Sequence, residues 1–299
     1  MYDALRKKVK LYENYTDAQI DLSMVMMGPD YRSYLSTTET HGPVGVLVLA
    51  HGYREKGDEM FTKEVEPISG HYPTAIAFGM SMVSSSHIQQ AVDDLVAAGA
   101  EKIVVIPALS SSFNTQMRQW ESMFGIHEDP GYLQATLIET KAQVIYAPPL
   151  ENHPIVARII GDYAKEKSVN PANEVVIVVS HGPEEKADND KTLALLESLA
   201  MKVKEVDGFS DAKWASLQND APREIRAANV EQLKGWVAEA NAQGKDVIIV
   251  TNLIAPRTIQ SEINKDLAGL NYKFDARGLT QHPLFEEWLR STVAEAIAP

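Results

Sequence analysis

Two histidines stand at positions where imidazole chemistry is expected. His51 and His181 each follow a short run rich in Val and Ile, and each precedes a glycine, Gly52 or Gly182. Imidazole binds transition metals and exchanges protons near neutral pH, and a glycine beside it permits a tight turn and a close approach to the backbone. We therefore take His51 and His181 as candidate catalytic and metal-binding residues. The alternative is that each ring only bonds a loop carbonyl, and it stays open.

Short apolar runs predict the strands that position these histidines. Runs of four to seven residues of this kind are typical of strands buried on both faces of a parallel sheet. Ligands bind such sheets at the carboxyl ends of the strands, the edge where His51 and His181 follow their runs. The predicted strands are Val44–Ala50, Lys102–Pro107, Val144–Ala147, Val175–Ser180 and Asp246–Thr251.

Helical spacing separates the predicted strands. His87–Ala98 is followed by Gly99, a typical helix stop. Alternating strands and helices indicate βαβ units and a doubly wound α/β fold. The face of this helix that we expect to be buried holds Ile88, Val92, Leu95 and Val96.

The order of features occurs twice along the chain. His181-Gly182 follows His51-Gly52 by 130 residues, and His282-Pro283 follows His153-Pro154 by 129. Nearly equal offsets between two pairs of landmarks indicate an internal duplication. For the two His-Pro elements we favour a structural role, in which the imidazole caps a helix or packs between the halves, because Pro suits the first helical turn.

The duplication predicts two tandem, similar, doubly wound parallel-sheet domains. We place them at 42–166 and 172–299, joined near 167–171, with residues 1–41 as an N-terminal arm packed on the body. The first half has extra length at 118–141, as expected for a loop or lid on a common scaffold.

Polar loops also follow the predicted strands. Ser86 is a candidate N-cap for the helix that starts near His87. A second loop, after Lys102–Pro107, is rich in hydrogen-bond donors that would bind substrate carboxylates, although capping and turn formation explain its residues equally well. Its candidates are Ser110, Ser111, Ser112, Asn114 and Gln116.

Composition excludes several classes of function. A formal charge of −13 over 299 residues disfavours nucleic-acid binding, and the absence of Cys excludes thiolate sites. No Walker, dinucleotide-binding, serine-hydrolase or His-Glu-x-x-His motif is present. No apolar stretch is long enough to span a membrane, and the first ten residues are no signal peptide. We expect a cytoplasmic protein, or a periplasmic one if a leader precedes Met1.

The run Val46–Arg54, which ends in His51-Gly52-Tyr53-Arg54, resembles the opening strand and His-Gly-x-Arg turn of class II, ATP-independent tetrapyrrole chelatases. The likeness is to the sirohydrochlorin cobaltochelatase (CbiX-type) family in particular. Residues 91–107 resemble the family's central helix and third strand. Val179–Pro183 resembles the strand-end Ser-x-His-Gly-x-Pro motif of ferrochelatases, with one residue fewer. Leu279–Leu284 resembles the family's late His-Pro element.

This resemblance implies two similar α/β halves facing a cleft that binds a tetrapyrrole. It implies insertion of a divalent metal, Co²⁺ or alternatively Ni²⁺ or Fe²⁺, into a sirohydrochlorin-like macrocycle, without nucleotide. His51 matches the metal-binding and proton-accepting histidine of the first half, and His181 matches its counterpart. Arg54 and Arg118, together with the polar loop, are candidate partners for substrate carboxylates.

The sequence departs from the family at two places. A second His is absent from the loop after the third strand, and Gly79–Met82 stands where a Glu is expected. His87, Asn114 or Gln116 would have to compensate, so the candidate metal ligands are His51, His87 and His181. A chelatase-fold protein that binds metal or tetrapyrrole without turnover is therefore the alternative, and a hydrolase or isomerase using both histidines is a third. The metal, macrocycle and oligomeric state stay open.

Overall fold

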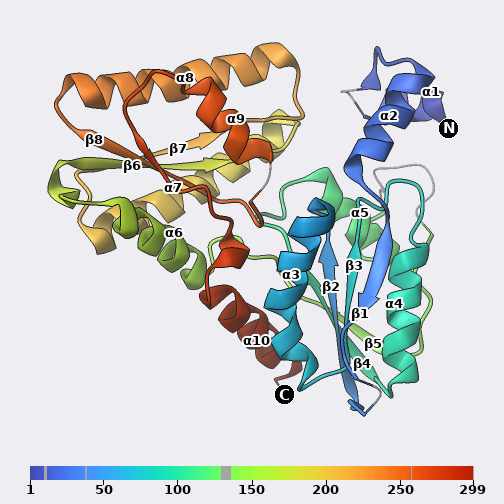
Figure 1. Cartoon of the computed structure of the whole chain (residues 1–299). Helices are drawn as coiled ribbons and strands as arrows, with labels where there is room; N and C mark the ends of the chain where they lie inside the picture. The colour runs from blue at the N-terminus through green and yellow to red at the C-terminus, as the bar shows by residue number, and fades with distance from the viewer. Residues whose placement is uncertain (10–11, 38, 129–135, 257, 299) are drawn as a thin grey trace. The chain divides into compact units, whose positions relative to one another are not determined.

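Two α/β units, each built around a sheet with parallel strands, make up the chain (Figure 1). The computed structural model describes residues 1–9, 12–37, 39–128, 136–256 and 258–298. Unit 1 comprises Met1–Pro149 and Glu286–Pro299, and unit 2 comprises Leu150–Phe285. The prediction of an α/β fold built around parallel sheets is confirmed, with one antiparallel edge strand that was not predicted.

The compact units do not follow the predicted boundaries of 42–166 and 172–299. Helix α6 (Pro154–Lys167) lies in unit 2, where it packs on α7 (Lys186–Asp207) and β8 (Asp246–Thr251). All but the first two residues of α10 (Leu284–Ile297) lie in unit 1. The physical reason for α6 is that it packs on elements of the second half, which the order of the repeats does not reveal.

The sheet of unit 1 has five strands in the order β1-β3-β2-β4-β5. Strand β1 pairs antiparallel with β3, and the other pairs are parallel. The arm thus adds an edge strand to the sheet as well as packing on the body. The strands are β1 (Tyr31–Tyr34), β2 (Val44–Ala50), β3 (Thr74–Phe78), β4 (Lys102–Pro107) and β5 (Gln143–Tyr146).

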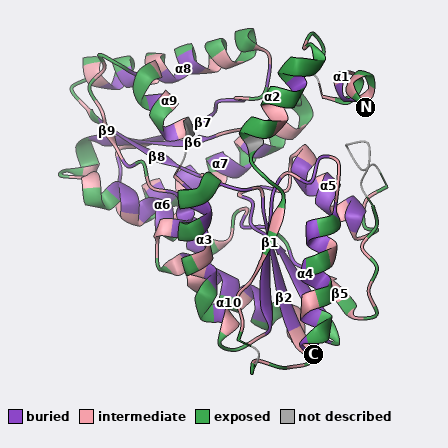
Figure 2. Cartoon of the chain, turned by 45° about the vertical axis from the view of Figure 1, so that its right-hand side comes forward, coloured by how far each residue is buried: buried purple, intermediate pink, exposed green. Residues whose placement is uncertain are grey.

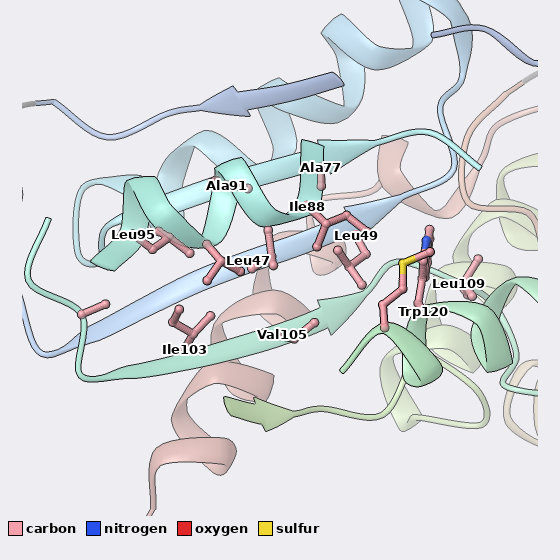
Figure 3. Close-up of a cluster of buried hydrophobic side chains, with 14 of the residues drawn as sticks. Leu47, Leu49, Ala77, Ile88, Ala91, Leu95, Ile103, Val105, Leu109 and Trp120 are labelled. Carbon is pink, nitrogen blue, oxygen red and sulfur yellow. The ribbon is translucent and has the colours of Figure 1, made fainter. Parts of the chain in front are cut away.

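Helices cover both faces of this sheet, with α4 on one side and α3 and α10 on the other (Figure 1). Ile88, Ala91 and Leu95 of α4 lie over the side chains of β2 and β4 (Figure 3). Val96, expected on the buried face, is instead exposed, whereas Ala91, which was not expected there, is buried. Figure 2 shows the burial concentrated along the strands. The helices are α3 (Arg54–Ser69), α4 (Ser86–Ala97) and α5 (Thr115–Met123).

The N-terminal arm folds over the segment that follows β3. It contains α1 (Tyr2–Lys8) and α2 (Asp17–Met27), and Thr16 and Gln19 form a capping box at the start of α2. Buried Leu5, Tyr12 and Ile20 form one apolar cluster with Met82. The arm therefore covers part of the carboxyl edge of the first sheet.

The sheet of unit 2 has parallel strands in the order β7-β6-β8-β9. Apolar residues of α8 and α9 pack against one of its faces. Among the described residues of either unit, no helix is long and apolar enough to cross a membrane. The remaining elements are β6 (Glu174–Ser180), β7 (Asp211–Ser216), β9 (Lys273–Phe274), α8 (Arg223–Ala242), α9 (Thr258–Asp266) and the 3₁₀ turns Pro171–Asn173 and Leu279–Gln281.

Candidate functional site

His51 is the first residue beyond β2, at the carboxyl edge of the first sheet. Its side chain is half-buried, and its ring lies edge-on to Tyr53 with centroids 4.6 Å apart. Gly52 has φ +84°, a left-handed conformation that favours glycine. The neighbouring strand is held close, because Gly79 N donates to Ala50 O at 2.8 Å. The structure thus places His51 where a ligand of a parallel sheet binds.

A buried carboxylate fixes the turn after His51. Asp58 accepts hydrogen bonds from Tyr53 N and from Tyr31 Oη, the latter at 3.0 Å. Burial, and next the hydrogen bond to Asp58, raise the pKa of the Tyr31 phenol well above its ordinary value, so Tyr31 stays a donor. Asp58 was not among the sequence candidates, because nothing local distinguishes it from the exposed acidic residues around it.

His181 occupies the same place beyond β6 in the second sheet. Its side chain is 35% exposed, its Nδ1 lies 2.8 Å from Gly182 O, and its Nε2 lies 3.6 Å from Asp220 Oδ2. Gly182 also has a left-handed φ of +75°. His51 and His181 therefore both stand at carboxyl strand ends, as the sequence predicts.

Asp220, which the sequence analysis missed, belongs to the loop after β7. Leu217 N donates to Ser180 O at 3.0 Å and Asn219 N donates to His181 O at 3.3 Å, so the loop is fastened beside the histidine. Its acid follows the second strand of the second half, the place where the first half lacks the expected Glu. That position in the repeat is the signal that would have found it.

His87 lies in a different environment from the other two histidines. It is 4% exposed, and its Nε2 is 3.1 Å from Ser81 Oγ. Burial lowers the pKa of His87, and the Asp30 carboxylate opposes that shift. Its Nδ1 has no hydrogen-bond partner among the described residues. The structure gives His87 the surroundings of a core histidine rather than those of an accessible metal ligand.

The arm brings a carboxylate to the edge near His51. Asp30 is exposed, and its Oδ1 accepts from Ser81 N at 3.2 Å. A Cβ at Gly79 would lie 2.0 Å from that Oδ1, so only glycine leaves room for Asp30. The missing Glu after β3 is thus accompanied by an acid from outside the repeat.

The polar loop after β4 is largely committed to local structure. Asn114 caps α5 by accepting from Met117 N at 2.8 Å, and it donates to Ser111 O at 2.7 Å. Ser111 Oγ accepts from Phe113 N, and Gln116 donates to Met80 O at 3.1 Å. Turn formation and capping therefore account for Ser111, Asn114 and Gln116.

The other residues predicted to bind substrate carboxylates are more exposed to solvent. Ser110 and Ser112 are half-buried, and Arg54 is exposed at the start of α3 with φ +63°. Arg118 lies within α5, where it donates to Thr115 Oγ1 at 3.2 Å. The loop or lid predicted at 118–141 begins in α5, and its residues 129–135 lie outside the described residues.

Two predictions about helix caps have different outcomes. His153 Nδ1 accepts from Ile155 N and His282 Nδ1 accepts from Leu284 N, both at 3.2 Å, so the capping role of the His-Pro elements is confirmed. The N-cap expected at Ser86 is wrong by one residue, because α4 begins at Ser86. Ser85 takes the N-cap position, but its hydroxyl donates to Thr136 O at 2.8 Å instead of capping the helix.

Within the described ranges, no three His, Asp or Glu side chains gather in a metal-binding cluster. His51 and His181 thus lie at equivalent strand ends, each with protein ligands too few for a closed structural site.

Comparisons with known proteins agree with this geometry. Residues 45–167 match the family model described as CbiX. A sirohydrochlorin cobaltochelatase of Methanothermobacter thermautotrophicus is 25% identical over 130 residues, which cover 41% of this chain and 91% of that protein. The solved structure of SirB from Bacillus subtilis with Fe³⁺ superposes with a TM-score of 0.64 at 16% identity, covering 86% of this chain and 96% of its own. The sirohydrochlorin chelatase SirB of Bacillus subtilis subspecies spizizenii in complex with cobalt gives 0.59 at 14% identity, with coverages of 85% and 95%.

Proposed function

We propose that the protein inserts a divalent metal into a sirohydrochlorin-like tetrapyrrole, and the match of residues 45–167 to the family model described as CbiX supports this proposal. The observation that carries the proposal is the placement of His51 and His181. Each is the first residue beyond the central parallel strand of its sheet, β2 or β6, and each precedes a glycine in the left-handed conformation.

Metal insertion replaces two pyrrole protons of the macrocycle by one M²⁺ ion, so the reaction needs metal ligands and proton acceptors but no nucleotide. A neutral imidazole performs both tasks near neutral pH. His51 and His181 are at least partly accessible, whereas His87 is buried. We therefore assign the handling of metal and protons to His51 and His181 and leave His87 to the core.

Substrate carboxylates would meet cationic and hydroxyl groups at the edge of the first sheet. Arg54 is exposed three residues after His51, and Ser110 and Ser112 are half-buried after β4. Guanidinium groups bind carboxylates in a bidentate manner, which orients the macrocycle as well as holding it. Ser111, Asn114 and Gln116 are left to support the loop.

Because the chain has no Cys, we expect a metal that binds well to imidazole and oxygen ligands. Cobalt and iron come first, because the two similar solved structures named above contain cobalt and Fe³⁺, and nickel follows. With cobalt or iron as the metal, the protein would serve the biosynthesis of a cobalamin-type or sirohaem-type product.

The second candidate is a protein that binds a metal or a tetrapyrrole without turnover. It is favoured by one observation, the lack of a three-ligand cluster among the residues described. In this alternative the histidines would hold their cargo at equilibrium, and no macrocycle proton would be lost.

Anaerobic absorbance titration with sirohydrochlorin separates the two candidates. Spectral perturbation on binding, followed after addition of Co²⁺ by conversion to the metallated spectrum faster than in buffer and without nucleotide, supports the chelatase. Perturbation with a conversion rate equal to that in buffer supports the binding protein and refutes the chelatase. Asp190→Asn, a substitution of an exposed residue on α7, should behave like the wild type in this titration and serves as a surface control.

A further inference from the structure

The turn that carries His51 has a strained backbone. Gly52, which follows the histidine, has φ +84°, and Arg54 has φ +63°. A left-handed conformation at a residue other than glycine, as at Arg54, persists only where the surroundings enforce it. Tyr53 stands between these two residues, and its contacts show what holds the turn.

Tyr53 is fixed through both its backbone and its side chain. Its N donates to Asp58 Oδ1, and its ring lies edge-on to the His51 ring with 4.6 Å between the centroids. The first turn of α3 packs closely on it, because a Cβ at Gly57 would lie 2.5 Å from Tyr53 Cβ. Tyr53 is 4% exposed, and a close-packed interior leaves such a side chain little room to move. The His51 ring therefore rests against a side chain whose own position is fixed.

A chain of aromatic contacts runs from Tyr53 to the N-terminal arm. Tyr53 packs on Phe61 of α3 with centroids 5.3 Å apart, and Phe61 meets Phe78 of β3 edge-on at 5.8 Å. Phe78 in turn stacks on Tyr31, its cross-strand partner in β1, at 5.0 Å. These separations lie in the range of favourable aromatic pairs, about 4.5–7 Å. The chain connects the His51 ring to a strand that the arm contributes.

Asp58 provides a second and shorter connection between the arm and the turn. Its Oδ2 accepts from Tyr31 Oη at 3.0 Å, and its Oδ1 accepts from Tyr53 N. Because Asp58 is 7% exposed, removing the Tyr31 hydroxyl would take a donor from a buried carboxylate oxygen, which is costly. The carboxylate would have to move to find another donor, and Tyr53 would move with it.

Unit 2 has no such connection. Its sheet ends at β7, whereas in unit 1 the arm strand β1 pairs with β3, the second strand of that half. The residue two places after His181 is Pro183, which has neither an aromatic ring nor a backbone N–H to donate. Tyr31 also lies outside residues 45–167, the part of the chain that matches the family model. The connection is therefore an addition to the first half alone.

We propose that Tyr31 is a positioning residue for His51. Through Asp58 and the aromatic chain it holds Tyr53, and Tyr53 sets the orientation of the His51 ring. The consequence for metal insertion rests on the proposed function, but the orientation of the ring does not. The rival interpretation is that Tyr31 only stabilises unit 1, in which case its hydroxyl can be removed without moving the His51 ring.

Tyr31→Phe in the full-length protein tests the proposal, because it removes the hydroxyl and keeps the stacked ring. Tyr12→Phe is the matched control, since it makes the same change in the same arm, where the Tyr12 hydroxyl lies 3.0 Å from Ser23 Oγ. In ¹H–¹³C NMR spectra of protein labelled at histidine, the ring signals of His51 should shift or broaden in Tyr31→Phe, because the ring current of Tyr53 acts on them. The His181 signals should stay unchanged, and Tyr12→Phe should move neither set.

Steady-state kinetics of Co²⁺ insertion into sirohydrochlorin give the second readout. Tyr31→Phe should lower kcat by about ten-fold, as for other residues that orient a metal-handling histidine. Its KM for the macrocycle should stay within about two-fold of wild type, because no group that contacts the macrocycle is removed. In an Asp58→Ala background, Tyr31→Phe should cause no further loss, because the hydroxyl acts through that carboxylate.

Three results overturn the proposal. They are unchanged His51 signals in Tyr31→Phe, equal changes in Tyr31→Phe and Tyr12→Phe, and a kcat of Tyr31→Phe equal to that of an active wild type. A different result separates this proposal from the function. If the His51 signals respond to Tyr31→Phe alone but the wild type does not metallate sirohydrochlorin, the positioning stands and the chelatase function fails.

Discussion

Replacing Gly182 by alanine should damage the second strand-end turn more than its backbone conformation alone explains. Gly182 has φ +75°, and a Cβ there would meet Ser216 Oγ at 1.9 Å and Gln218 N at 3.0 Å. Gly208 has almost the same φ, +73°, but nothing lies within 4 Å of the place that a Cβ would take there. The two glycines therefore separate the cost of conformation from the cost of crowding.

The expected magnitudes follow from these two terms. A left-handed conformation costs a non-glycine residue about 1–2 kcal/mol, so Gly208→Ala should lower the free energy of unfolding by about that amount. Crowding in a packed region adds about 1–3 kcal/mol, so Gly182→Ala should lower it by about 2–5 kcal/mol. At a slope of about 2 kcal/mol per molar urea, the unfolding midpoint should fall by about 1–2.5 M.

Urea unfolding followed by tryptophan fluorescence gives the midpoints, and hydrogen exchange in peptides covering β6 and β7 assigns the loss to unit 2. In a Ser216→Ala background the penalty of Gly182→Ala should shrink, because the nearest clashing atom is gone; the two changes should couple by about 0.5–3 kcal/mol. Equal penalties for Gly182→Ala and Gly208→Ala, or no coupling with Ser216→Ala, would refute the crowding argument.

Three further predictions concern the arm, acid stability and the polar loop. Gly79→Ala would place its Cβ 2.0 Å from Asp30 Oδ1 and should release the arm, so limited proteolysis should cut within residues 1–41 sooner than in wild type; an unchanged pattern would contradict the contact. Burial raises the pKa of Asp275, but hydrogen bonds from Arg277 outweigh it and hold the pKa below its ordinary value. The stability that this adds is present above the unfolded pKa and is lost as pH falls below about 4, so the gap in urea midpoint between wild type and Asp275→Asn should close in acid; a gap independent of pH would contradict this. Asn114→Ala removes the cap of α5 and should cost about 1 kcal/mol of stability with unchanged Co²⁺ binding; weakened Co²⁺ binding would return Asn114 to the site.

The central strands were predictable because burial on both faces leaves a plain signal. Val44–Ala50, Lys102–Pro107 and Asp246–Thr251 are strands with the expected bounds, and Val175–Ser180 gains only Glu174. The placement of His51 and His181 at strand ends follows from those runs. Local sequence carries this information, because a short Val- and Ile-rich run has few other stable environments.

Features that depend on partners distant in the sequence were not predictable. Tyr31–Tyr34 is a strand only because it pairs with β3, and α10 joins unit 1 across the whole second half. The same limit applies to the site. The residues next to His87 in the sequence do not reveal that its ring is buried and contacts Ser81. Likewise, Asp220 contacts His181 only because the loop after β7 folds back toward it.

The initial rate of Co²⁺ insertion into sirohydrochlorin, measured anaerobically without nucleotide, tests the central claim that strand-end histidines handle the metal. Wild type should exceed the rate in buffer. His51→Ala and His181→Ala should each reduce the catalysed rate by about 10²-fold or more, as expected for loss of a group that accepts protons in the transition state, with circular dichroism unchanged. Wild-type rates in both variants would contradict the account.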